Sequence, residues 1–243
     1  MEILLQPENW VALLTLTFLE IVLGIDNIIF ISLVAQKLPA EKQRVARNLG
    51  LSMALVFRIL LLMSISFIIQ LKEPFMEIFS RGISGRDVIL FAGGVFLIAK
   101  STSEIHHKVT SFGEKESKEQ KKKGKFWPAV VQIVLLDIIF SIDSILTAIG
   151  LSDQVLLMIM AVIISLIIMM VFAGAVGDLI NKYPTLQILA LSFLILIGFT
   201  LVLEVEAFPF HAHIEKGFIY FAVFFSLSVE MLNITMRKRS NQK

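Results

Sequence analysis

Two long apolar stretches of this chain contain the same arrangement of acidic residues. In each, an acid is followed after five residues by a second acid, with a small amide or hydroxyl side chain directly after it. The two copies are Glu20, Asp26 and Asn27, and Asp137, Asp143 and Ser144. A carboxylate in the middle of a membrane costs about 2.5–3.5 kcal/mol, so four would cost about 10–14 kcal/mol without compensation. The fold must therefore neutralise these acids, and a bound cation would do so.

The composition is that of a protein that crosses a membrane several times. Hydrophobic residues make up 56% of the chain and charged residues only 17%, whereas soluble domains are less apolar and more charged. No separate soluble domain is visible. The chain has no cysteine, hence no thiolate ligand for a soft metal. Residues 1–9 lack the basic segment of a cleaved signal peptide, so we expect the first apolar stretch to be retained.

Seven stretches are long and apolar enough to be transmembrane helices. They are Trp10–Leu33, Leu49–Leu71, Val88–Ser103, Phe126–Leu151, Val155–Val176, Leu186–Leu203 and Gly217–Met236. The third is short and requires Lys100 to extend its charge to the membrane surface. Between the second and third stretches, Lys72 to Asp87 mixes apolar and polar residues, which favours a short amphipathic helix lying along the membrane.

The basic residues predict how the chain is oriented. With seven crossings, 17 Lys and Arg residues fall in the loops and tail on one side and four on the other. Cytoplasmic loops carry the excess of positive charge. We therefore expect the N-terminus outside and the C-terminus inside.

The repeated motif also predicts an internal symmetry. Its copies lie in the first and fourth stretches, an odd offset of three crossings, so they run through the membrane in opposite directions. Inverted repeats that meet at polar helices in the middle of the membrane are typical of secondary transporters. The predicted fold is an all-α membrane protein with two inverted three-helix repeats and a seventh helix. Its parts are residues 1–103 (first repeat), 104–125 (charged cytoplasmic linker), 126–206 (second repeat) and 207–243 (seventh helix and basic tail).

The acids have the chemistry of a site for a hard metal ion. On a continuous helix Glu20 and Asn27 share a face, while Asp26 lies roughly 120° away from Glu20. Both acids could join one site only if the helix loosens, and Gly24 and Ser141 lie at the matching positions between them. Carboxylate, amide and hydroxyl oxygens favour Mg, Ca or Mn over Cu or Zn. The predicted metal ligands are Glu20, Asp26, Asn27, Asp137, Asp143 and Ser144.

A structural alternative is that these acids pair with internal bases and lock the helices together. Arg58 lies in the middle of the second stretch, and Lys100 could serve an acid near the cytoplasmic end. Two bases cannot neutralise four acids, which favours the metal site, with Arg58 as a charge partner that competes with the ion. Glu230 and Asn233 are neighbours on the last helix that either join the polar core or face the cytoplasmic surface. The secondary polar core is predicted to contain Arg58, Lys100, Glu104, Glu204, Glu230 and Asn233.

At these residues the chain resembles the TerC family of seven-span bacterial membrane proteins. The similarity is carried by Glu20 with Gly24-Ile25-Asp26-Asn27, and by Asp137-Ile138-Ile139-Phe140-Ser141-Ile142-Asp143-Ser144. It extends over essentially the whole chain and is closest to members without an attached soluble domain. The resemblance implies kinship to the lysine-exporter superfamily, a place in the bacterial plasma (inner) membrane, and manganese export. It also implies that the motif acids and their Asn and Ser neighbours bind the metal.

The leading hypothesis is therefore a Mn(II) exporter that works by alternating access, and not an enzyme. Its expected partners are the transported divalent ion, membrane lipid and protons as coupling ions, with no nucleic acid and no catalytic cofactor. An exporter of a small organic solute, such as an amino acid, is an alternative because Arg58 supplies a charge of the other sign. An intramembrane aspartyl protease is a second alternative, but Gly24-Ile25-Asp26 lacks the second Gly of the expected Gly-x-Gly-Asp.

Overall fold

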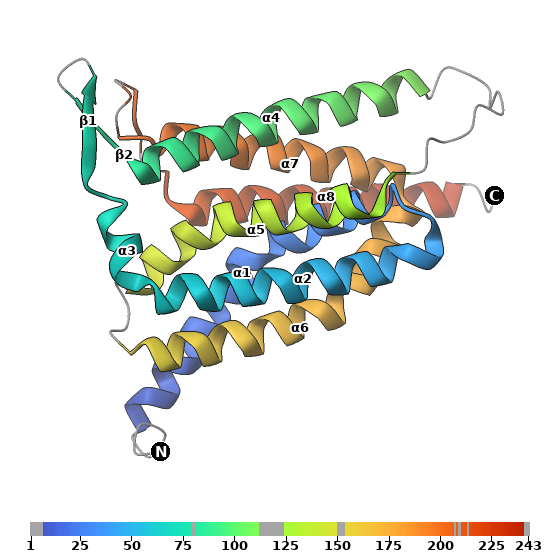
Figure 1. The fold of residues 1–243 in the computed structure, drawn as a ribbon. Helices are drawn as coiled ribbons and strands as arrows, with labels where there is room; N and C mark the ends of the chain where they lie inside the picture. Colours follow the sequence, from blue (N-terminus) through green and yellow to red (C-terminus); the bar gives the residue numbers. More distant parts are fainter. Residues whose placement is uncertain are drawn as a thin grey trace.

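The computed structural model describes residues 7–78, 81–111, 124–149, 154–206, 208, 210–212 and 214–240. These residues form eight α-helices and one β-hairpin (Figure 1). The helices are α1 (Pro7–Ala35), α2 (Ala40–Met63), α3 (Ile65–Gln70), α4 (Gly85–Ser111), α5 (Phe126–Ile149), α6 (Val155–Lys182), α7 (Pro184–Leu203) and α8 (Lys216–Ser240). The strands are β1 (Pro74–Ile78) and β2 (Arg81–Ser84), which pair antiparallel.

The predicted helical membrane architecture is confirmed. Six helices of the described chain are long and apolar enough to cross a membrane, namely α1, α2, α4, α6, α7 and α8, and α5 contains a shorter apolar segment, Phe126–Ile142. Each of the seven predicted stretches overlaps one of these helices, and the second, Leu49–Leu71, also includes the short helix α3. In Figure 1, α1 begins and α8 ends at opposite ends of the bundle. The number of crossings and their direction stay predictions.

Two segments differ from the expectation. The amphipathic helix predicted for Lys72 to Asp87 is wrong, because this segment forms the β-hairpin. Gly82 makes the pairing possible, since a Cβ atom there would lie 2.5 Å from Cβ of Pro74 on the facing strand. The predicted linker also begins later than expected, because α4 continues to Ser111. Its residues 112–123 lie outside the described part of the chain.

The hairpin is tied to α4 and to the segment after α7. Ser84 and Asp87 bond reciprocally at the start of α4: the Ser84 amide donates to the Asp87 carboxylate (3.0 Å), and the Asp87 amide donates to Ser84 Oγ (3.1 Å). Asp87 also accepts from the backbone of Glu206 at 2.9 Å, and Arg81 donates to the carbonyl of Phe208 at 2.6 Å. Reciprocal bonds of this kind satisfy amide groups that the first helical turn leaves open.

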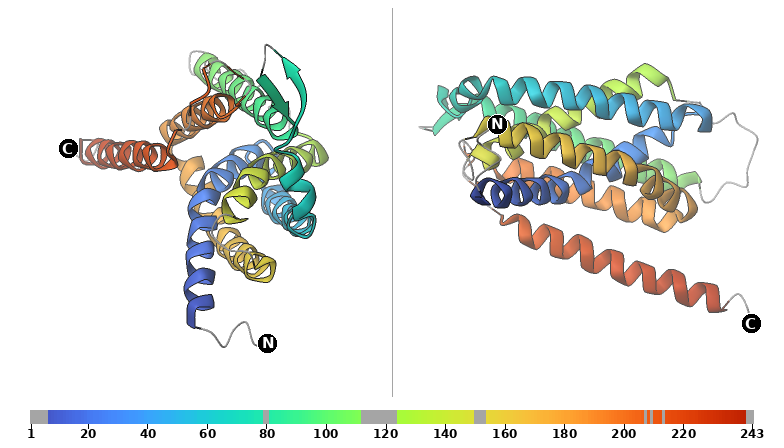
Figure 2. Two further views of the ribbon diagram at one scale, coloured as in Figure 1. Left: turned by 90° about the vertical axis from the view of Figure 1, so that its left-hand side faces the viewer. Right: turned by 90° about the horizontal axis from the view of Figure 1, so that it is seen from below.

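The long helices form two groups. In the first, α1 packs along α6, α2 packs along α5 and α6, and α1 crosses α5. In the second, α4 packs along α7. Helix α8 packs against α7 and lies at the edge of the bundle, where both views of Figure 2 show it.

The helices α4 and α7 approach most closely at a pair of glycines. A Cβ atom at Gly94 would lie 2.5 Å from the carbonyl oxygen of Gly198, and a Cβ atom at Gly198 would lie 2.8 Å from that of Gly94. Both distances are too short for any side chain. Small residues let helix backbones come this close in membranes.

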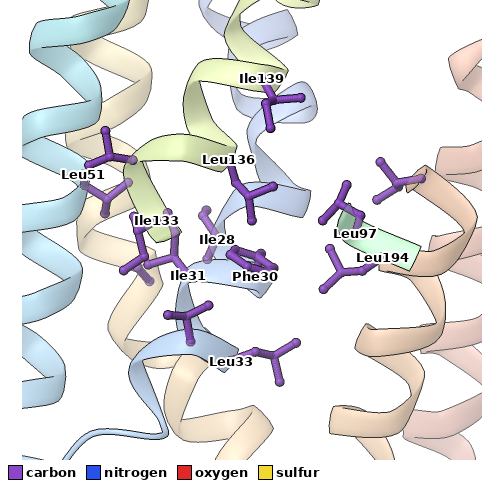
Figure 3. Close-up of a cluster of buried hydrophobic side chains, with 14 of the residues drawn as sticks. Ile28, Phe30, Ile31, Leu33, Leu51, Leu97, Ile133, Leu136, Ile139 and Leu194 are labelled. Atoms are coloured by element: carbon purple, nitrogen blue, oxygen red, sulfur yellow. The ribbon is translucent and has the colours of Figure 1, made fainter. Parts of the chain in front are cut away.

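Two apolar clusters fill the first group of helices. One contains Leu13 and Leu16 of α1, Leu62 of α2 and Ile145 of α5. The other is larger and reaches the second group, so that Leu97 of α4 and Leu194 of α7 lie opposite the α1 and α5 residues Phe30 and Leu136 (Figure 3). The polar residues described next lie between these clusters along α1, α2 and α5.

Candidate functional site

Arg58 is the centre of a buried polar network that joins three helices. Its Nη1 donates to Glu20 of α1 (2.6 Å), and its Nη2 donates to Asp137 of α5 (3.1 Å). Its Nε donates to Oγ of Ser141 at 2.9 Å. The exposed fractions are only 2% for Arg58, 3% for Glu20 and 4% for Asp137. Charges buried this deeply require close partners, and here each nitrogen of the guanidinium faces an oxygen.

The small polar residues of the two motifs extend this network. Asn27 donates its amide to Asp137 at 3.3 Å, so the first copy of the motif contacts the second directly. Ser141 donates to the backbone carbonyl of Asp137 one turn earlier at 2.6 Å. Ser144 donates to the carbonyl of Ser141 at 3.2 Å. The structure therefore brings together Glu20, Asn27, Asp137 and Ser144, four of the six predicted ligands.

The helices that carry the motifs are continuous at Gly24 and Ser141. The loosening that we considered for these positions is therefore not found. Gly24 instead permits close packing, since a Cβ atom there would lie 2.4 Å from Sδ of Met169 on α6. The other two predicted ligands, Asp26 and Asp143, have helical backbones, but their side chains lie outside the described part of the structure.

The network opens onto a pocket of about 60 Å³ between the two groups of helices. Oxygen-bearing side chains from four helices or their ends line it: Glu20, Asn27, Ser144, Thr200, Glu204 and Tyr220. Arg58 lines it as well, with apolar side chains that include Phe140 and Ile197. The pocket therefore offers carboxylate, amide and hydroxyl oxygens to a small ligand.

The remaining predicted core residues lie in three places. Glu204 lines the same pocket as Glu20 and pairs with Arg86 of α4 at 3.4 Å. Lys100 and Glu104 contact each other (3.3 Å) near Lys37, apart from the Arg58 network. Glu230 and Asn233 contact each other at 3.3 Å on α8, which packs only at the edge of the bundle. The structure thus joins Arg58 and Glu204 to the motif residues but separates the other four from them.

Sequence reasoning missed Thr200, Tyr220 and Arg86. Thr200 lies four residues before Glu204, which places both on one face of the predicted sixth helix. That spacing could have added Thr200 to the site. The roles of Arg86 and Tyr220 depend on which helices become neighbours, and the sequence pattern carries no signal of that.

Within the described side chains, no group of three or more His, Asp or Glu residues is placed to hold a metal ion. The Arg58 guanidinium lies between Glu20 and Asp137, where it takes the place of a cation. A metal that used these two carboxylates would have to exchange with Arg58.

Comparison with known proteins places the chain in a family. It is 51% identical over 235 residues to the "UPF0053 inner membrane protein YgdQ" of Escherichia coli K12, covering 97% of this chain and 96% of that protein. It is 47% identical over 233 residues to a "UPF0053 protein" of Haemophilus influenzae, covering 96% of each. It is 42% identical over 238 residues to the "UPF0053 inner membrane protein YoaE" of E. coli K12, covering 98% of this chain but only 45% of that protein.

No solved structure matches this chain significantly. A family profile described as "Integral membrane protein TerC family" matches residues 5–243. The chain is therefore a multi-pass membrane protein and belongs to the TerC family.

Proposed function

We propose that this protein exports a divalent metal ion, Mn(II), from the cytoplasm across the inner membrane. The observation that carries the proposal is the buried network of Glu20, Asp137 and Arg58, in which two carboxylates share one guanidinium. The sequence adds Asp26 and Asp143 to the same two helices. One guanidinium carries too little charge to neutralise four carboxylates, and a divalent cation would supply the missing positive charge.

The chemistry of the donors supports a hard ion. Glu20, Asp137, Asn27 and Ser144 offer only oxygen atoms as ligands, and the chain has no cysteine. Oxygen sets of this kind suit Mg, Ca and Mn. In this proposal Arg58 holds the two carboxylates when the ion is absent and withdraws from them when the ion binds. Binding and release then exchange one positive partner for another, so the acids are never left buried without one.

The helix contacts support alternating access. In the two predicted repeats, α1 corresponds to α5, α2 to α6 and α4 to α7. Under this correspondence the contact of α1 with α6 is equivalent to the contact of α5 with α2, and both are present. The contacts of α1 with α5 and of α4 with α7 map onto themselves. A two-fold relation between inverted repeats predicts this set of contacts. We propose that the two repeats expose the ion site to the two sides in turn, with protons as coupling ions.

One observation favours the alternative of an organic solute. The pocket contains both Glu20 and Arg58 beside the aromatic side chains of Phe140 and Tyr220, as a site for an amino acid would. Its volume of about 60 Å³ is small beside the roughly 300–1,000 Å³ of pockets that bury drug-sized ligands. The space fits an ion with a few waters, which favours the metal. The proposal assigns no catalytic step and no cofactor to the protein.

The test is manganese export by variants that lose one carboxylate with little change in shape. We expect Glu20→Gln, Asp137→Asn, Asp26→Asn and Asp143→Asn each to leave manganese-sensitive cells with as much intracellular manganese as cells without the protein. The matched control is Asp178→Asn, which removes an exposed acid of α6 and should protect cells like the parent. Equal protection by Glu20→Gln and Asp137→Asn at parental expression would contradict the ligand role.

Purified protein in liposomes separates the two candidate functions. Uptake of Mn(II), Mg(II), Ca(II) and a set of amino acids is compared in the same vesicles. Transport of amino acids without any metal would favour the organic-solute alternative.

A further inference from the structure

A second pocket, of about 30 Å³, is lined by residues of α1, α4, α5, α7 and the loop between α1 and α2. It is close to the loop between α1 and α2, at the end of the bundle that the distribution of basic residues predicts to be cytoplasmic. Apolar side chains of α1 and α7, including Phe30, Leu33 and Leu194, form one wall. The polar side chains around it come from the α1–α2 loop, α4 and α5: Lys37, Lys100, Ser101, Glu104, Lys108 and Gln132.

The pocket has an excess of positive charge. Lys37 and Lys100 both contact Glu104, Lys100 at 3.3 Å. Lys108 donates to the side-chain oxygen of Gln187, whose own amide donates to the carbonyl of Ile180 at 2.9 Å. The described lining of the pocket thus contains three lysines and one carboxylate. Partial burial and the neighbouring charge of Lys100 lower the pKa of Lys37, while Glu104 raises it.

The pocket also has unused hydrogen-bond donors. Ser101 is 1% exposed, and its Oγ has no hydrogen-bond partner among the described residues. The same is true of Nε2 of Gln132 on the facing helix α5. A buried polar group without a partner costs about 1–3 kcal/mol. The pocket therefore has both unpaired hydrogen-bond donors and an excess of positive charge. A ligand that is negatively charged and accepts several hydrogen bonds would match it.

We propose that this pocket binds the phosphate group of an anionic phospholipid. The volume of about 30 Å³ accommodates one or two oxygen atoms, which would accept from Ser101 and Gln132. The rest of the headgroup would lie at the opening, among the three lysines. Basic pockets between transmembrane helices on the cytoplasmic side bind anionic headgroups. Phe30, Leu33 and Leu194 are at most 8% exposed and close the pocket on its inner side, so the acyl chains would lie outside the pocket, in the membrane. This inference does not depend on which solute the protein carries.

The test compares ligands on the delipidated full-length protein. Phosphatidylglycerol, zwitterionic phosphatidylcholine and inorganic phosphate are titrated separately, and binding is followed by native mass spectrometry and by the shift in melting temperature. We expect phosphatidylglycerol to bind and stabilise the protein, and the other two to have little effect. In Lys37→Gln/Lys100→Gln/Lys108→Gln the affinity for phosphatidylglycerol should fall on the order of 100-fold.

The control variant is Lys42→Gln/Arg44→Gln/Lys182→Gln, which removes three exposed basic residues from the same end of the bundle and should keep the parental affinity. Ser101→Val, which fills the pocket but leaves every lysine, should also weaken phosphatidylglycerol binding. Equal losses in the two triple variants would overturn the proposal, because binding would then follow total charge. Equal stabilisation by inorganic phosphate would overturn the assignment to a lipid.

Discussion

At the scale of single residues, the contacts of Arg58 determine how the acids can be buried. From α2, its three nitrogen atoms donate to Glu20 on α1 and to Asp137 and Ser141 on α5. The planar guanidinium suits this arrangement because its donors are fixed in different directions. If it were lost, two carboxylates at 3% and 4% exposure would both lose their contact with its positive charge. Breaking a buried pair in this way costs about 3–5 kcal/mol.

We therefore expect Arg58→Met to lower the stability of the protein by about 3–5 kcal/mol, measured by unfolding in mixed micelles. Arg58→Lys should cost less, because the charge remains, but one ammonium group cannot reach all three partners. The informative control is Arg58→Met/Glu20→Gln/Asp137→Asn, which removes every charge of the network and should recover most of the loss. If Arg58→Met were as stable as the parent, Arg58 would not be the residue that neutralises Glu20 and Asp137.

The sequence predicted the chemistry of this site better than its geometry. The cost of burying a charge identified Glu20, Asp137 and Arg58 as members of a polar core, without reference to any neighbour. Which acids Arg58 would bridge depends on how α2 packs between α1 and α5, and that arrangement is set by apolar side chains over the whole bundle. The contact of Lys37 with Glu104, 67 positions away, was not predicted for the same reason.

At the scale of helices, the crossing of α4 and α7 depends on two glycines. The distances of 2.5 and 2.8 Å from each added Cβ atom to the opposite carbonyl oxygen show that neither helix can carry a side chain at this point. The obstacle is backbone, which cannot move aside as a flexible side chain could. Any larger residue must push the two helices apart. The shape of the 30 Å³ pocket, which side chains of both helices line, would then change as well.

Gly94→Val and Gly198→Val should therefore each destabilise the protein by about 3 kcal/mol or more, measured as a lower melting temperature and a smaller yield of monodisperse protein. Gly217→Val is the matched control, because an added Cβ atom at Gly217 has no atom within 4 Å. If Gly94→Val and Gly198→Val both had the parental melting temperature, α4 and α7 would be farther apart at this crossing than in the structure.

The helices were predictable because each one satisfies a simple requirement of length and apolar content. The break between α2 and α3 was not, since Leu49–Leu71 reads as one apolar stretch while the helix ends at Met63. The hairpin was mispredicted because a mixture of apolar and polar residues fits a surface helix as well as a strand. Its decisive contact joins Pro74 to Gly82, and no helical or strand periodicity encodes that contact.

At the scale of the whole molecule, both pockets are lined by side chains of α1, α5 and α7, hence of both helix groups. The first pocket contains Glu20 and Arg58, and the second contains Lys37 and Leu33. Next to the second pocket, Leu97 and Leu194 of one helix group belong to the same apolar cluster as Phe30 and Leu136 of the other (Figure 3). An ion could pass only if the pair α4 and α7 moved relative to α1 and α5. Alternating access thus predicts relative motion between the two helix groups.

Tying the groups together should stop export. The parent contains no cysteine, so only an introduced pair can react with a short bis-thiosulfonate reagent, which joins two thiols through disulfide bonds that a reductant cleaves. We expect Leu33→Cys/Leu194→Cys, whose side chains line the same pocket from α1 and α7, to export Mn(II) before cross-linking, to stop after it, and to resume on reduction. The control Phe91→Cys/Phe208→Cys joins α4 to the segment after α7, where the two rings lie 5.4 Å apart. Both of its positions move with the same group, so cross-linking should leave export unchanged. Full cross-linking of the first pair without any loss of export would show that the ion crosses without separation of α1 from α7.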